Sequence, residues 1–277
     1  MLCTAVVAAF SQNKTELNKP VFKAGQKFQT SNIVKTTSKM EMMGQEMETK
    51  ADVAITRLFE IKKQNGNLYN VAATITKMAT TAEMMGQSMS YDSDKKEDAG
   101  TEIGKLLKDK INVPADMEMN DEGKITPLKK EKKDSADAGG IAAMMESMGA
   151  GADETALTDD MFINIPKNLK AGDTWSDSII AEGTKTYRDY TVKSLEGSDA
   201  VLTISGKQTL DKKMETNGME MTMLMESKLT GEMTADTSTG VIKQRLLVSE
   251  GSGNLEMMGQ QVPMTTKVET TSTTMSL

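Results

Sequence analysis

Methionine is the residue type with the most chemical potential in this chain, which has 25 Met but only 5 Phe, 4 Tyr and 1 Trp. Thioether side chains are flexible and polarizable, and surfaces built from them suit promiscuous apolar binding. On one side of a strand, alternate residues lie about 7 Å apart. We therefore predict a concave, Met-lined sheet that binds a lipid-like ligand, and the alternative is that Met simply fills a core poor in aromatics. The candidate ligand-binding residues share one parity: Met47, Met219, Met221, Met223, Met225 and Met233.

Soft-metal binding is a second interpretation of the methionines, because thioethers are suitable ligands for Cu(I) and Ag(I). Three groups lie near predicted turns: Met40, Met42, Met43 and Met47; Met84, Met85 and Met89; Met257, Met258 and Met264. No His or Cys accompanies them, so no metal site or cofactor is assigned.

Most enzymatic chemistries are disfavoured by composition. The chain has no His, which removes the usual general base near neutral pH and all imidazole metal sites. The segment Ser93-Asp94-Lys95-Lys96 has the spacing of a Ser–Lys dyad but lies in a polar, loop-like stretch. Acidic residues outnumber basic ones by 40 to 33, which disfavours nucleic-acid binding. We predict a protein that is not an enzyme and has no catalytic residues.

The first residues predict export. Residues 1–11 are uncharged and mostly apolar and end in Ala9-Phe10-Ser11, as in the late part of a signal peptide whose beginning is missing. The run is too short to span a membrane, so we expect no transmembrane span and a location in the periplasm, cell envelope or extracellular space. Cys3 lies within this run, and an N-terminal strand is the alternative.

An internal duplication organises the rest of the chain. Lys23-Ala24-Gly25 recurs 147 residues later as Lys170-Ala171-Gly172, whereas Glu83-Met84-Met85-Gly86-Gln87 recurs after 173 residues. The larger offset indicates an inserted hairpin at about 184–210. We therefore expect a first β repeat over 12–92, a central helix, hairpin and linker segment over 93–160, and a second β repeat over 161–277.

Apolar residues alternate with polar ones in both repeats, as in Val53, Ile55, Phe59 and Ile61. This period of two is typical of antiparallel strands with one solvated face. The runs are longer than ordinary strands, which favours a curved sheet. The predicted fold class is mainly β: a long curved antiparallel sheet or open barrel, with a short helical segment between the copies.

Several short motifs resemble an uncharacterised family of secreted bacterial proteins, typical of Bacteroidota and defined as a domain of unknown function. They are Ile165-Pro166 before Ala171-Gly172-Asp173-Thr174-Trp175, the hairpin Asp121-Glu122-Gly123-Lys124-Ile125, and the turn Asp236-Thr237-Ser238-Thr239-Gly240-Val241-Ile242. The resemblance implies export and a β-rich fold, and the layout is similar to the half-barrels of lipoprotein carriers. The expected partner is an apolar small molecule or lipid, and the alternative is a structural or protein-interaction module that contacts another envelope protein.

Overall fold

A computed structural model describes residues 17–18, 21–42, 44–84, 86–107, 110–120, 125–128, 161–181, 183–216, 219–257 and 259–277. The predicted signal segment and the linker over 129–160 lie outside the described residues. The first half contains β1 (Leu17–Asn18), β2 (Lys27–Met42), β3 (Gln45–Asn65), β4 (Leu68–Met84), β5 (Gln87–Asp92), the 3₁₀ turn η1 (Lys96–Gly100), α1 (Glu102–Leu107), β6 (Pro114–Asn120) and β7 (Ile125–Pro127). The second half contains β8 (Ile165–Pro166), β9 (Thr174–Ala181), β10 (Thr184–Glu196), β11 (Asp199–Thr216), β12 (Met219–Asp236), β13 (Ile242–Met257) and β14 (Gln260–Ser276).

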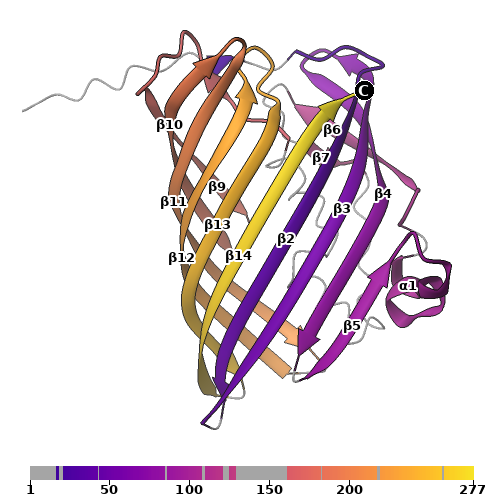
Figure 1. Cartoon of the computed structure of the whole chain (residues 1–277), viewed down its shortest axis with the longest axis vertical. Coiled ribbons are helices and arrows are strands. Elements are labelled where there is room, and N and C mark those ends of the chain that lie inside the picture. The colour runs from indigo at the N-terminus through magenta and orange to yellow at the C-terminus, as the bar shows by residue number, and fades with distance from the viewer. Residues whose placement is uncertain are drawn as a thin grey trace, which may run out of the picture.

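One antiparallel sheet dominates the molecule. Its strand order is β7-β6-β4-β3-β2-β14-β13-β12-β11-β10-β9, with β5 paired to β4 beside this path, and the sheet does not close on itself. The predicted fold class is confirmed, including the unusual strand length, since β3 has 21 residues and β11 has 18. Figure 1 shows the bend of the sheet, in which the lower parts of β11 and β12 turn behind the central strands β14 and β2.

The two halves of the chain meet in the middle of this sheet, where β14 pairs with β2 from Met264↔Met40 to Ser276↔Phe28. Strands begin at Gln45 and Met219, and at Leu68 and Ile242, each pair 174 residues apart. The segment in which the sequence predicts an inserted hairpin, about 184–210, forms all of β10 and the first part of β11, which pair with each other. Where the first half has the single strand β2, the second half therefore has three strands, β9, β10 and β11.

Most hairpin turns are tight. Between β3 and β4 the paired residues Asn65 and Leu68 leave a two-residue loop, and its first residue, Gly66, has φ of 61°. The second loop residue, Asn67, does not have a positive φ, so this is a type II′ turn, which matches the twist of the flanking strands.

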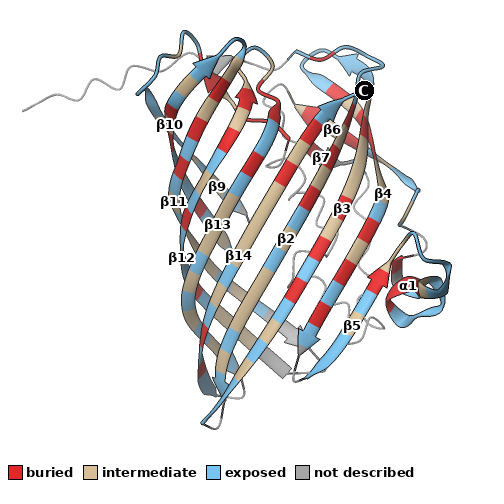
Figure 2. Cartoon of the chain, viewed as in Figure 1, coloured by how far each residue is buried: buried red, intermediate tan, exposed pale blue. Residues whose placement is uncertain are grey.

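The two faces of the sheet differ sharply, because strand side chains alternate between them. Figure 2 shows buried residues alternating with exposed or intermediate ones along the long strands. The register places all the apolar cluster residues of β2, β3 and β10–β14 on one face, including Phe28, Phe59, Leu202 and Met233. The other face carries exposed residues such as Lys35, Lys228 and Glu250.

The apolar face is the concave one. Phe162 packs against Phe28 of β2, with ring centroids 6.0 Å apart, whereas Ile165 packs in the cluster with Leu202 of β11. In a flat sheet β2 and β11 would be about 19 Å apart, since four strand spacings separate them. Three residues of chain span only about 10 Å, so the sheet curves around this segment.

Residues 161–165, the covering segment, close one end of the concave face. We call this end the packed end. The backbone of the covering segment is hydrogen-bonded to the β12–β13 turn through Ile163 N to Gly240 O at 2.8 Å and Ile242 N to Met161 O at 2.8 Å. Phe22 adds a second layer, with ring centroids 5.5 Å from Tyr69 and 4.8 Å from Phe162. The aromatic core therefore stabilises only one end of the long strands.

Glycines on the concave face allow the bend. Gly206, Gly231, Gly251 and Gly253 occupy concave positions of β11, β12 and β13. A Cβ on Gly231 would meet the carbonyl oxygen of Leu246, and one on Gly253 would meet that of Leu224. Side chains at these positions would prevent the close approach of neighbouring strands, as expected for glycine kinks in a curved sheet.

Two elements lie in the segment that the sequence assigns to the region between the repeats. A short helix, α1, lies within the predicted range 99–110 and packs Ile103 and Leu107 against Tyr91 and Met78. The predicted hairpin is also present, since Met119 pairs with Ile125. Within the described residues, no helix is both long and apolar enough to cross a membrane.

Candidate functional site: the concave face of the sheet

Below the packed end, the concave face of β13, β14 and β2 changes from apolar to polar, whereas β3 and β4 keep an apolar cluster that packs against α1. Arg245, Ser272 and Asn32 lie directly opposite one another on β13, β14 and β2. In the next row, Thr274, Thr30 and Arg57 are opposite one another on β14, β2 and β3. We call these six residues the polar belt.

Five of the six polar-belt residues are deeply buried, and the side chain of the sixth, Arg57, is half-buried. Thr30 is 2% exposed, Asn32 5%, Arg245 4%, Ser272 1% and Thr274 6%. The hydroxyls of Ser272 and Thr274 have no hydrogen-bond partner in the described part of the chain. A buried hydroxyl without a partner is destabilising, so these two groups are available for an acceptor that the chain itself does not provide.

The arginines concentrate positive charge on this face. The chain has only three, and the register places Arg57, Arg188 and Arg245 all on the concave side. Arg57 has no ion-pair partner within the described ranges, and burial lowers the pKa of its guanidinium to about 10. An acidic chain therefore has a cationic interior surface.

One carboxylate is present among the described strand residues of the concave face, that of Asp177. Arg188 holds it with two parallel bonds, Nε to Oδ1 at 2.9 Å and Nη2 to Oδ2 at 2.8 Å. The hydroxyl of Tyr190 donates to Oδ2 at 2.9 Å, and Trp175 stacks on the Tyr190 ring. This two-point geometry is the preferred arrangement of arginine with a carboxylate.

Toward the opposite end of the strands, methionines line the concave face. Met47, Met40 and Met264 are opposite one another across β3, β2 and β14, and Gly253 separates Met264 from Met225. Between this end and the polar belt, β2 and β14 present several hydroxyl groups on this face, including Ser38, whose Oγ lies 2.5 Å from Thr266 Oγ1. We define the methionine end by Met40, Met47, Met221, Met223, Met225 and Met264.

The structure brings together most of the sequence-predicted ligand-binding residues. Met221, Met223 and Met225 occupy successive concave positions of β12, the first two half-buried and the third 8% exposed. Met233, on the same face, instead packs in the core beside Leu202. Met219 belongs to β12, but its side chain is outside the described part of the structure.

The Ser–Lys candidate over residues 93–96 is accounted for by local structure. The Ser93 hydroxyl accepts a hydrogen bond from the backbone N–H of Met78 at 3.0 Å, and Asp94 pairs with Lys77 at 2.7 Å. No hydrogen bond joins Ser93 to Lys96 within the described ranges. Three or more Cys, Asp or Glu residues arranged to hold a metal ion are likewise absent from the part of the chain that the structure describes.

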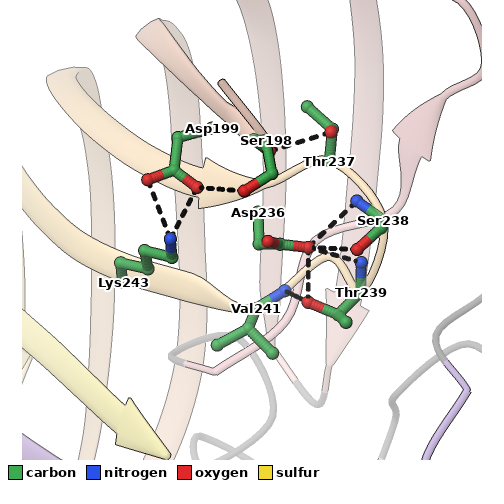
Figure 3. A network of polar contacts seen from close by, with 8 residues as sticks. All are labelled: Ser198, Asp199, Asp236, Thr237, Ser238, Thr239, Val241 and Lys243. Carbon is green, nitrogen blue, oxygen red and sulfur yellow. Dashed lines mark hydrogen bonds and ion pairs between the residues drawn. The ribbon is translucent and has the colours of Figure 1, made fainter. Parts of the chain in front are cut away.

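Asp236 organises the β12–β13 turn (Figure 3). Its Oδ1 accepts hydrogen bonds from N and Oγ of Ser238 at 3.0 and 2.6 Å and from N and Oγ1 of Thr239 at 2.8 and 2.9 Å. Burial raises the pKa of this carboxyl, but the hydrogen bonds from Ser238 and Thr239 outweigh burial and lower it to about 2. Beside it, Lys243 Nζ holds both oxygens of Asp199 at 2.6 and 2.8 Å. These contacts fix a turn at the packed end.

Sequence reasoning missed the polar belt. Its signal was present, because Arg57 shares the parity of Ile55 and Phe59, so the apolar alternation itself places this cation on the buried face. The sequence does not show that hydroxyl groups lie in a row beside Arg57, because Thr30 and Thr274 come from strands more than 200 residues apart.

Comparisons with solved structures give only weak likenesses. The chain is similar to an outer membrane channel from Pseudomonas putida F1, with 8% identity, coverage of 93% of this chain and 98% of that chain, and a TM-score of 0.21. It is also similar to the β domain of the Bordetella autotransporter BrkA, with 8% identity, coverage of 91% and 99%, and a TM-score of 0.22. At such TM-scores these likenesses support no functional argument.

No curated protein matches the chain. Residues 66–242, more than half of its length, match a protein family whose description is "Family of unknown function (DUF6263)". The matched range runs from the turn before β4 to the first residue of β13 and so includes both ends of the sheet order. The chain therefore belongs to the DUF6263 family.

Proposed function

We propose that this protein is a non-enzymatic, exported binding protein that carries an apolar, lipid-like ligand on the concave face of its sheet. The observation that carries the proposal is the asymmetry of that face. One end is filled by aromatic residues, while the other end presents half-buried methionines such as Met40, Met47 and Met223. A sheet that needed only a core would bury these side chains as completely as those of the packed end.

The composition of the face also supports a carrier. Met side chains adapt to ligands of differing shape, and a curved surface buries more of an acyl chain than a flat one. The signal-like segment over residues 1–11 supports export to the periplasm, envelope or exterior.

The test uses binding of the neutral fluorescent probe N-phenyl-1-naphthylamine to the delipidated full chain. Two adjacent threonines of β14 provide a matched pair of variants. Thr266 is half-buried on the concave face opposite Ser38, whereas Thr265 is exposed on the outer face opposite Lys39. We expect Thr266→Trp to block binding and Thr265→Trp to leave it unchanged. Equal affinity in both variants, or no probe binding by the wild type, would contradict the proposal.

Soft-metal binding is a second candidate, favoured by one observation. Met47, Met40 and Met264 are adjacent in register across three strands, and directly opposed residues have Cβ atoms about 5 Å apart. Three thioethers at this spacing suit Cu(I) or Ag(I). Titration of Ag(I) followed by native mass spectrometry tests it: one bound ion, lost on Met40→Leu, supports this candidate, and an unchanged mass excludes it.

A further inference from the structure

The use of arginine in this chain is selective. Of 33 basic residues only three are Arg, and all three face the concave side, while the basic residues of the outer face are Lys. Arginine differs from lysine in presenting a planar fork of donors that fits a carboxylate and in being less strongly hydrated. Its restriction to the concave face indicates recognition of an anion in a poorly hydrated place.

Arg188 and Arg57 differ in their partners. Arg188 already binds a carboxylate of the chain, Asp177, through two hydrogen bonds, and the one between Nη2 and Oδ2, of 2.8 Å, is also the ion pair. Arg57 has no such partner within the described ranges, although burial lowers its pKa to about 10. A buried cation without a counter-ion is strongly unfavourable, so an anion bound beside Arg57 would relieve this cost.

Hydrogen-bond donors lie around Arg57. Thr30 is directly opposite it and Thr274 is one strand further, with Ser272 in the next row. The hydroxyls of Thr274 and Ser272 lack partners among the described residues. Together with the guanidinium, they form a set of donors that converges on one small region of the concave face.

We infer that the ligand of the concave face is a long-chain fatty acid, whose carboxylate lies beside Arg57, Thr274 and Ser272 and whose chain extends toward the methionine end. This inference rests on the proposed function and specifies its ligand class. The ten residue steps from Thr30 to Met40 extend about 33 Å along β2, a length sufficient for a long acyl chain. The concave side chains of this stretch are half-buried at Val34, Thr36, Ser38 and Met40.

Arg57 and the unpartnered hydroxyls of Thr274 and Ser272 can all donate hydrogen bonds to an anion. On this same face a carboxylate is the anion that an arginine already binds, as Asp177 does with Arg188. A carboxylate head group is therefore the one we specify, and the test includes a phosphatidic acid because arginine also binds phosphate in two-point geometry.

The test compares palmitate with 1-hexadecanol, which has the same chain and no charge, on the delipidated full chain at about pH 8, where a carboxyl group is ionised. Binding is measured by displacement of the neutral probe. We expect palmitate to bind about 10- to 100-fold more tightly than hexadecanol, the range expected for hydrogen bonds to a charged group. Arg57→Met should abolish that difference by weakening palmitate binding and leaving hexadecanol binding within about twofold of wild type.

A second pair of variants covers a failure of Arg57→Met to fold. Thr274→Val removes a belt hydroxyl with little change of shape, and Thr273→Val makes the same change on the outer face opposite Ser31. We expect only the first to weaken palmitate binding. Equal affinity of wild type for palmitate and hexadecanol would overturn the fatty-acid inference while leaving the carrier proposal intact. Tighter binding of a phosphatidic acid than of palmitate would also overturn it, and absence of binding by every ligand would refute both.

Discussion

Replacing Arg57 with methionine should stabilise the unliganded protein. The guanidinium is largely buried on β3, faces Thr30, and has no ion-pair partner in the described part of the chain. Burial alone lowers its pKa to about 10, which corresponds to about 3 kcal/mol of free energy against the charged form. Methionine keeps an unbranched apolar stem of similar length beside Ile55 and Phe59, so the packing contributed by the arginine methylenes is largely retained.

The expected gain in unfolding free energy is at most about 3 kcal/mol, or a rise in melting temperature of about 6 to 12 °C for a chain of this size. The pH dependence follows from the direction of the pKa change. Below about pH 10 the arginine is charged in both the folded and unfolded states, so the penalty is complete and the gain is constant. As the pH rises from about 10, the folded protein loses this proton first and the difference between variant and wild type diminishes.

Urea denaturation and calorimetry of the delipidated chain at about pH 6 and pH 8 would measure the effect. Arg57→Lys is the control, because it keeps a buried charge and should show no gain. A loss of more than about 1 kcal/mol in Arg57→Met would refute the reasoning, since it would mean that Arg57 forms a favourable ion pair in the folded protein.

Three further perturbations test the fold around the site. Asp236→Asn should lower the free energy of unfolding by about 1 to 2 kcal/mol at neutral pH. Because the folded pKa of about 2 lies below the ordinary value, the wild type should keep this advantage above about pH 4 and lose it as the pH falls toward 2. Urea denaturation at several pH values measures the difference. Gly231→Val should lower the free energy of unfolding by about 1 to 3 kcal/mol or more, because the new side chain meets the backbone of β13. A control substitution at the exposed neighbour Thr230 should leave the melting temperature unchanged. Asp177→Ala should destabilise by about 2 kcal/mol by leaving Arg188 without its carboxylate, and an unchanged melting temperature would show that the pair is energetically neutral.

The alternation of apolar and polar residues was enough to predict long antiparallel strands and to assign Met47, Met221, Met223 and Met225 to one face. That success has a simple cause: a strand has a period of two, so parity along the chain is parity of face. Turn glycines such as Gly66 and Gly240 were equally visible, since tight turns need residues that tolerate positive φ.

Only the tertiary structure decided which residues of that face are neighbours. Strand pairing between β14 and β2 joins residues more than 200 positions apart, and this non-local register places Thr274 near Arg57 and Met264 beside Met40. The direction of curvature also depends on tertiary structure, because it needs both the glycines of β11–β13 and the segment at Phe162 that crosses the concave side. Sequence periodicity thus determined the face of each side chain, whereas long-range pairing and curvature determined that three arginines and a row of hydroxyls share one interior surface.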